Sequence, residues 1–331
     1  MKKKIIGITM GDPAGIGPEL CLRILKEKKV LKQCQPVVFG DAAVLERVAR
    51  KCGLATPAEV ISIEKWITTK QAPNPPLVVD CQTVDALNVV PGRINAACGS
   101  AAYRYIEAAV ITAMQGKIAG IATAPINKES LHLAGIKFPG HTEILAHLTR
   151  ARRVCMMMAS DELKVSLITI HIGIAEVRKQ LTRRRITDAI ELTAVALKRL
   201  GKKSPLIAVC ALNPHGGEHG LFGREEQQII EPAIRQAIKA GLKIEGPVVP
   251  DTAFLAANRK RIDAYVVMYH DQGLIPFKML AFDKGVNITL GLPIVRTSVD
   301  HGTAFDIAWQ GKASATSMIQ SVLWAVKLAG R

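Results

Sequence analysis

Three short apolar runs in this sequence each lead to a histidine. Each run has the length and aliphatic content of a buried strand, and glycine or proline ends it. In a parallel sheet the carboxyl ends of such strands lie at one edge, where open α/β sheets bind their ligands. The pattern therefore predicts an α/β fold with its chemistry at the strand exits. The runs and their histidines are residues 164–170 with His171, residues 206–212 with His215, and residues 264–269 with His270.

Three histidines at one sheet edge have the chemistry of a divalent-metal site. Neutral imidazoles bind Zn²⁺ and similar ions, and a site with three protein ligands keeps an open position for substrate. Each histidine taken singly also fits an ordinary loop residue that bonds to backbone, but the same placement at three exits favours the metal. His219, four residues after His215 in a glycine-rich loop, is predicted to face solvent instead.

Length and composition limit the class of protein. The 331 residues fit two α/β lobes, and 49% hydrophobic with 22% charged residues is typical of a folded globular chain. No apolar run reaches the length of about 18 residues that a membrane helix needs. The first ten residues have a basic tip and a short apolar run, which predicts a first strand and a cytoplasmic protein with no membrane partner. Seven scattered cysteines without a CxxC pair are typical of reduced thiols.

The net charge of +16 raises the question of a nucleic-acid partner. Aromatic residues make up only 4% of the chain, so stacking platforms for single strands are scarce, and no duplex-reading motif is visible. We therefore expect no nucleic acid, and a basic surface that draws anionic substrates inward. A non-catalytic anion- or nucleic-acid-binding protein stays an alternative; it predicts steeply salt-dependent binding and indifference to chelators.

Two further segments suggest anion contacts. Residues 11–19 form a glycine-rich turn between a predicted strand and a helix; they either present N–H groups to a phosphate or make a tight connection. A helix is predicted over residues 144–150 with Thr142 as its N-cap, which places His141 beside a helix amino end where anions bind. Asp251, in a loop, is predicted to orient a metal-binding histidine or move a proton, unless it is a solvated loop carboxylate.

Six stretches of the sequence match one known family, in the same order along the chain: residues 11–19, 140–143, 213–215, 268–274, 285–293 and 296–304. Through them the chain resembles the PdxA family of 4-hydroxythreonine-4-phosphate dehydrogenases over essentially its whole length. The resemblance implies a fold like the isocitrate and isopropylmalate dehydrogenases, with two α/β/α lobes and a central cleft. It also implies a homodimer and NAD or NADP as oxidant. We expect residues 1–127 and 297–331 in the first lobe, and residues 128–296 in the second.

The resemblance also implies roles for individual residues. One divalent ion (Zn, Mg, Mn or Co) is expected in a site completed across the dimer, and the family's metal ligands match His171, His215 and His270. The family's substrate contacts match His141, Thr142, Lys278, Asn287 and Arg296. Around His171 this chain has Ile170 and Ile172 where the family usually shows a threonine and a polar or proline-containing turn. His219 stands where the family often has glycine.

The activity implied is metal-assisted, NAD(P)-dependent oxidative decarboxylation of 4-phosphohydroxy-L-threonine to 3-amino-2-oxopropyl phosphate, in pyridoxal phosphate synthesis. Asp251, Asp271 and Lys278 are the candidate catalytic residues. Paralogues of the family act on D-threonate or D-erythronate 4-phosphate, which gives sugar-acid catabolism as the alternative. A metal-dependent hydrolase or lyase would use the same histidines without nicotinamide, and NAD binding discriminates between the two classes.

Overall fold

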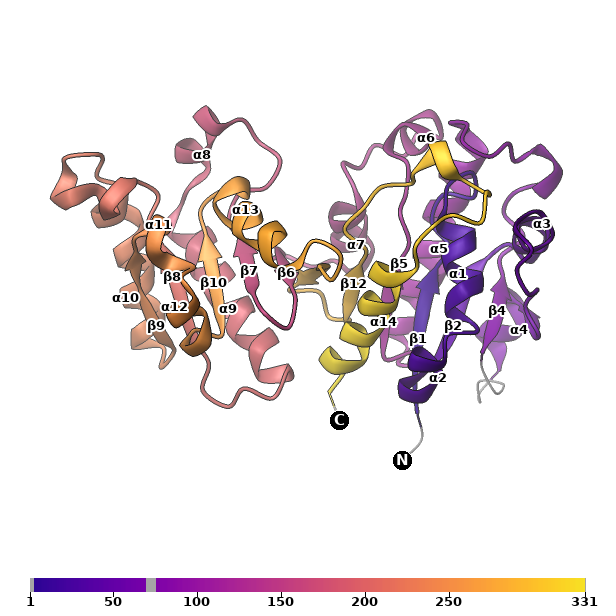
Figure 1. Cartoon of the computed structure of the whole chain (residues 1–331), viewed down its shortest axis with the longest axis horizontal. Helices are drawn as coiled ribbons and strands as arrows, with labels where there is room; N and C mark the ends of the chain where they lie inside the picture. The colour runs from indigo at the N-terminus through magenta and orange to yellow at the C-terminus, as the bar shows by residue number, and fades with distance from the viewer. Residues whose placement is uncertain (1–2, 70–75, 331) are drawn as a thin grey trace. The chain divides into compact units, whose positions relative to one another are not determined.

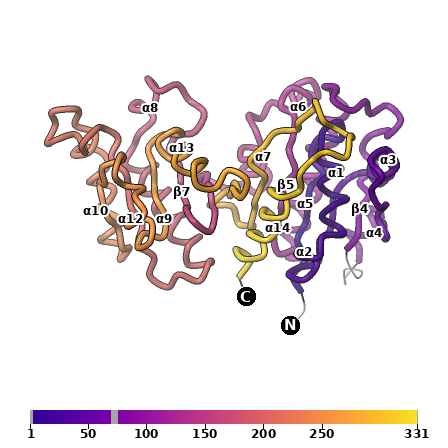
Figure 2. The backbone as a smooth tube through the Cα atoms, in the orientation of Figure 1, coloured from indigo at the N-terminus to yellow at the C-terminus, as the bar shows by residue number. Residues whose placement is uncertain are grey.

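The computed structural model describes residues 3–69 and 76–330 and divides into two compact α/β units. The first unit consists of residues 3–151 and 292–329, and the second of residues 152–291. In Figure 2 the indigo-to-magenta and yellow parts of the trace belong to the first unit, and the pink and orange parts to the second. The chain therefore leaves the first unit once and returns to it.

The described strands of the first unit pair in the order β3-β4-β2-β1-β5-β12, and all these pairs are parallel. The chain moves from β1 outward to β2 and β4, then crosses to β5 on the other side of β1. The topological switch point, where open α/β sheets bind ligands, thus lies between β1 and β5. The strands are β1 (Lys4–Thr9), β2 (Cys34–Gly40), β3 (Val60–Ser62), β4 (Leu77–Asp80), β5 (Gly120–Thr123) and β12 (Arg296–Ser298).

The long helix α5 organises the packing of this unit. It lies against β1, β2 and β5 and also contacts α6 and α7. A Cβ atom on Gly99 would lie 2.1 Å from the Ser130 carbonyl oxygen, so the small-residue face of α5 allows α6 to approach closely. Because α6 and α7 pack on α5, they lie in the first unit, whereas the sequence analysis placed residues 128–149 in the second lobe.

The helices of the first unit are α1 (Gly17–Ile24), α2 (Lys28–Gln33), α3 (Ala42–Cys52), α4 (Ile63–Thr68), η1 (Ala86–Asn88), α5 (Ala96–Met114), α6 (Lys128–Leu133), α7 (His141–Thr149), η4 (Phe305–Ile307) and α14 (Thr316–Leu328).

The described strands of the second unit pair in the order β11-β6-β7-β10-β8-β9. β6 pairs antiparallel with β11 and β7, while β7, β10, β8 and β9 form a parallel set. β6 and β7 form a hairpin around residues 160–162. The strands are β6 (Cys155–Ala159), β7 (Lys164–Leu167), β8 (Leu206–Cys210), β9 (Lys243–Val248), β10 (Ala264–Val267) and β11 (Val286–Leu290).

Helix α9 covers this sheet, because Ile186, Ile190 and Leu197 on one of its faces are buried. Thr182 begins the helix by accepting a hydrogen bond from the Arg185 N–H. In the described part of the chain, every helix is too short or too polar to cross a membrane. The helices of this unit are α8 (Ile174–Gln180), α9 (Arg183–Arg199), η2 (Pro214–Gly220), η3 (Glu226–Ile230), α10 (Glu231–Lys239), α11 (Pro250–Ala253), α12 (Ala256–Arg261) and α13 (His270–Ala281) (Figure 1).

The turn from β1 to α1 needs glycine at its first position. Gly11 has φ +73°, and a Cβ atom there would lie 2.3 Å from the Pro125 carbonyl oxygen. Two independent constraints therefore act on one residue, the left-handed backbone and the close approach of the β5 exit.

A pair of glycine substitutions separates these two constraints. Gly116 has nearly the same φ of +72°, but a Cβ atom there meets nothing within 4 Å. Gly116→Ala should lower the free energy of unfolding by about 1 kcal/mol through backbone strain alone, and Gly11→Ala by at least about 2 kcal/mol more. Urea unfolding of both variants measures the difference, and equal losses would contradict the close approach.

Candidate active site

The strands that precede the three histidines are neighbours in one parallel sheet. Figure 1 shows β10 between β8 and β7, and β10 pairs in parallel with both. His270 begins α13 three residues after the end of β10, while His171 and His215 follow β7 and β8. The sequence prediction that three strand exits lie at one edge of the sheet is therefore confirmed.

Two of the three histidines lie together. The ring centroids of His171 and His270 are 5.6 Å apart, with 44° between the ring planes. Two imidazoles on one tetrahedral ion, with bonds of about 2.0–2.1 Å, have centroids roughly 5 Å apart. The pair thus has both the chemistry and the spacing of two ligands of a divalent ion.

His215 lies on η2, and its ring centroid is 6.2 Å from that of Phe222. Among residues 3–69 and 76–330 of a single chain, no three His, Cys, Asp or Glu side chains are grouped as a metal site. The three-histidine site, which the family resemblance completes across two chains, stays a prediction. His219 is exposed, as the sequence analysis expected.

Asp271 contacts His270, the candidate metal ligand that precedes it in the sequence. Its Oδ1 lies 2.7 Å from His270 Nδ1, and because an ionised carboxylate only accepts, Nδ1 carries the hydrogen. This fixes the tautomer of His270 and leaves Nε2 available for an ion, an arrangement typical of metal-binding histidines. For Asp271, one of the candidate catalytic residues, the contact supports a role in orienting the His270 ring.

The other predicted residues of the second unit lie on separate elements. Lys278 is two turns along α13 from His270, and its Nζ lies 5.2 Å from the ring centroid of Phe282. Asn287 on β11 donates through Nδ2 to Met156 Sδ at 3.2 Å, while its buried Oδ1 has no hydrogen-bond partner in the described chain. Such an orphaned acceptor suits a donor on a ligand. Asp251 is exposed in the first turn of α11, which packs against η2.

In the first unit, His141 and Thr142 open α7. The prediction of Thr142 as N-cap is wrong. The helix begins three residues earlier than predicted, Gly140 precedes it without a side-chain cap, and Ile144 N donates to Gly140 O at 3.2 Å. The first N–H groups of a helix have no partner within it, so this end of α7 can still meet an anion.

Arg296 supplies a buried positive charge in this unit. It is 2% exposed, and its Nη2 donates to Thr123 Oγ1 at 2.7 Å. Burial lowers the pKa of Arg296 to about 9. Burial and the nearby Arg296 charge hold the pKa of His141 well below its usual range, so its imidazole is neutral. His141 Nε2 is buried without a hydrogen-bond partner in the described chain, which makes it a second orphaned atom suited to a ligand.

Comparisons with known proteins identify the family. Residues 32–325 match the model of the family described as pyridoxal phosphate biosynthetic protein PdxA. The chain belongs to the PdxA family.

Relatives within the PdxA family cover nearly all of the chain. It is 47% identical over 324 residues to a 4-hydroxythreonine-4-phosphate dehydrogenase of Desulforapulum autotrophicum, covering 98% of this chain and 95% of that one. It is 46% identical over 329 residues to a D-threonate 4-phosphate dehydrogenase of Salmonella typhimurium, covering 99% and 100%. The crystal structure of a 4-hydroxythreonine-4-phosphate dehydrogenase from Klebsiella pneumoniae superposes with a TM-score of 0.89 at 44% identity, covering 99% and 100%. The α/β fold of the PdxA family is thereby confirmed, and the chain is an oxidoreductase.

The glycine-rich turn of this PdxA-family chain is a tight connection. Asp12 N donates to Pro125 O at 2.9 Å, and Ile16 N donates to Thr303 O at 3.0 Å. Ala14 N donates to Asp12 Oδ1 at 2.9 Å. Because these N–H groups already have partners within the protein, the turn does not offer them to a phosphate. Of the two alternatives left open by the sequence, the structure supports the connection.

Sequence reasoning missed two buried carboxylate features. Asp12 is fully buried, and burial raises its pKa to about 6. Glu225 and Glu226 bond to the loop that carries His215. One signal in the sequence points to the contacts of Glu225 and Glu226 with this loop: the two acidic residues stand together just after a glycine-rich loop, at the start of a helix.

Asp12→Asn should change how stability depends on pH. The pKa of Asp12 in the folded state, about 6, lies above the ordinary value of 3.8, so the folded state holds its proton more tightly and loses stability as pH rises from 4 to 6. Asparagine keeps the acceptor for Ala14 N but cannot ionise. The variant should therefore gain about 2 kcal/mol on the wild type between pH 4.5 and 7.5.

Denaturant unfolding at these two pH values checks this, with Asp306→Asn at an exposed position as control. A gain that is the same at both pH values would mean that the Asp12 carboxyl is not perturbed by burial.

Proposed function

We propose that this PdxA-family enzyme catalyses the NAD(P)-dependent and divalent-metal-dependent oxidative decarboxylation of 4-phosphohydroxy-L-threonine, in pyridoxal phosphate synthesis. The observation that carries the proposal is the His171–His270 pair at adjacent strand exits, with Asp271 fixing His270. It is supported by the 47% identical relative named for that activity.

The metal ligands are His171, His215 and His270. When bound there, a divalent ion (Zn, Mg, Mn or Co) supplies a Lewis acid that lowers the pKa of a substrate hydroxyl and stabilises developing negative charge. Asp271 keeps the His270 ring in the ligating orientation. Asp251, exposed beside the His215 loop, is the candidate for proton transfer to and from solvent.

The anionic ends of the substrate meet the two cationic residues. Arg296, the start of α7 and the Thr142 side chain form one anion site in the first unit, where burial strengthens electrostatic attraction. Lys278 serves a second anionic group. The neutral His141 offers Nε2, and Asn287 offers Oδ1, to hydrogen-bonding groups of the substrate.

The oxidation needs a hydride acceptor, for which NAD or NADP is the cofactor. The hydride leaves the carbon that bears the substrate hydroxyl, and the hydroxyl proton passes to a base. The resulting β-keto acid then loses carbon dioxide, with the electron pair of the broken C–C bond held as an enolate until it is protonated.

D-threonate 4-phosphate, with D-erythronate 4-phosphate, is the second candidate substrate. The relative named for D-threonate 4-phosphate is 46% identical, one point below the hydroxythreonine relative. The two substrates share the phosphate and the vicinal hydroxyl, and they differ where one has an ammonium and the other a hydroxyl. Both groups donate to an acceptor such as Asn287 Oδ1, so the proposed contacts accept either molecule. A hydrolase or lyase is disfavoured, because these relatives are all named dehydrogenases.

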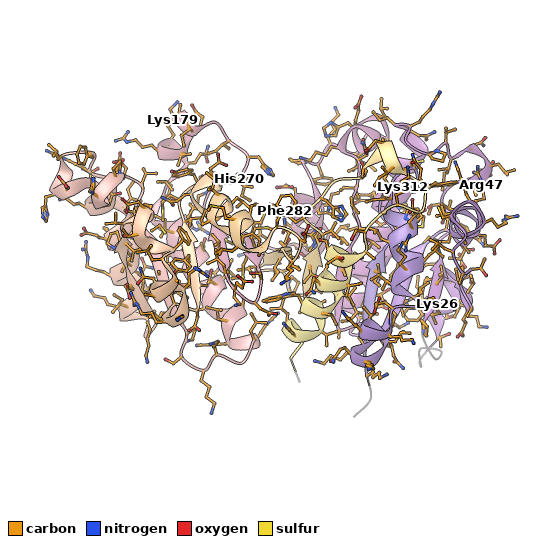
Figure 3. The ribbon with its side chains drawn as sticks, in the orientation of Figure 1. Lys26, Arg47, Lys179, His270, Phe282 and Lys312 are labelled. Carbon is orange, nitrogen blue, oxygen red and sulfur yellow. The ribbon has the colours of Figure 1, made fainter. Side chains whose placement is uncertain are left out.

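We also propose a cytoplasmic homodimer whose active site both chains complete. Helix α13 carries a large apolar stripe at Ile275, Met279 and Phe282, which are 59%, 82% and 71% exposed in the single chain. Figure 3 labels His270 and Phe282 at the two ends of this helix. Exposed stripes of this kind mark protein interfaces. A partner on α13 would lie next to the residue that begins the helix, His270.

The function is tested by nicotinamide reduction with the purified protein and a divalent metal. We expect turnover of 4-phosphohydroxy-L-threonine that stops with chelator, and no turnover by His215→Ala even with added metal. Preferential turnover of D-threonate or D-erythronate 4-phosphate would assign the second candidate. Activity that survives in His215→Ala would contradict the three-histidine site.

The dimer is tested by Met279→Lys, which puts a charge in the apolar stripe. Light scattering after size exclusion should show a dimer for the wild type and a largely monomeric variant, because a charge buried without a partner costs several kcal/mol. Met114→Lys, at a 52% exposed methionine near the end of α5, is the matched control and should stay dimeric. If Met279→Lys dimerises as the wild type does, α13 is not the interface.

A further inference from the structure

The loop that carries His215 has an unusual backbone. His215, Gly216, Gly217, Glu218 and His219 all have positive φ, from 38° to 81°. Three of these residues have side chains, and left-handed backbone costs such residues about 1 kcal/mol or more each. A conformation of this cost persists only where surrounding contacts determine it.

Glu226 forms hydrogen bonds with the residues at the start of this loop. Its carboxylate is 2% exposed, and Oε1 accepts hydrogen bonds from Leu212 N at 2.8 Å and Asn213 N at 2.9 Å. Oε2 accepts from Asn213 Nδ2 at 2.9 Å. A Cβ atom on Gly217 would lie 2.7 Å from the same Oε2, so the loop packs directly on the carboxylate. Glu226 also begins η3, a π-helical turn of a kind frequent at functional sites.

Glu225 extends the contact to a second segment. Its Oε2 accepts from Asn213 Nδ2 at 2.9 Å, and its Oε1 pairs with Arg178 Nε on α8. Burial alone would raise the pKa of Glu225, but the hydrogen bonds from Arg178 and Asn213 outweigh it and hold the pKa below its usual range. Helix α8 begins three residues after His171. One network of charge-assisted hydrogen bonds therefore joins the segments that carry His171 and His215.

We infer that Glu226, together with Glu225, positions the His171 and His215 segments for metal binding. The two carboxylates bond to the chain's own groups, so we assign them as positioning residues that act through the backbone of residues 212–213 and through the Asn213 side chain. The inference rests on the proposed function, because it assigns these histidines as ligands. Residues that orient metal ligands typically contribute 10–100-fold to metal affinity.

The test is the Zn²⁺ dissociation constant of the full-length protein, measured in competition with a chromogenic chelator. Glu226→Ala removes all three acceptor contacts, and we expect its dissociation constant to rise 10–100-fold. Glu226→Gln keeps an oxygen for Leu212 N and Asn213 N but turns an NH₂ group toward the Asn213 amide. Its dissociation constant should therefore lie between those of the wild type and the alanine variant. Glu231→Gln, at a residue five positions along that pairs with Arg235, is the control and should bind as the wild type does.

Metal affinity separates positioning from a general contribution to folding, which would lower the thermal midpoint of the metal-free variants and leave the dissociation constant unchanged. A rise of threefold or more in the Zn²⁺ dissociation constant of Glu226→Ala supports the inference, and a smaller rise overturns it. If the alanine variant does not fold, the same threshold applies to Glu226→Gln. Wild-type protein that binds no Zn²⁺, or His215→Ala that binds it equally well, would overturn the proposed metal site itself, a result distinct from failure of the Glu226 variants alone.

Discussion

The parallel pairing of β10 with both β7 and β8 is the constraint on which the candidate site depends. Val266 pairs with Val209, and Val267 pairs with Leu167, so three strands end in register at one edge. Burial of their side chains fixes this register, because a slip by one residue would turn apolar groups to the opposite face. The histidines that follow the strands are thereby brought to the same edge from distant parts of the sequence.

Several groups near the strand exits cost stability. Arg296 is buried with its charge, Asp12 is buried with a raised pKa, and the His215 loop has a left-handed backbone. Each of these departs from what a chain selected only for stability would contain, and such departures concentrate at functional sites. The buried carboxylates of Glu225 and Glu226 offset part of this cost by satisfying the backbone and side chain at the start of the loop.

The strands and their histidines could be predicted because both signals are local. An apolar run predicts a strand, and a polar residue at its end marks the edge where ligands bind. The N-cap of α7 and the assignment of residues 128–149 failed, because tertiary contacts with α5 and the conformation of Gly140 decide them. The proximity of His141 to Arg296 and the bonds of Glu226 to residues 212–213 join residues whose approach depends on the folded chain.

The third metal ligand is the part of the site that stays a prediction, because the described residues of one chain bring His171 and His270 together without a third His, Cys, Asp or Glu grouped as a metal site. The most direct measurement is anomalous diffraction from crystals of the protein loaded with Co²⁺ or Zn²⁺. The account predicts one ion bound by nitrogen atoms of His171, His215 and His270 at about 2.0–2.1 Å, drawn from two chains of a dimer. An ion held without His215, or an ion at another place in the fold, would contradict it.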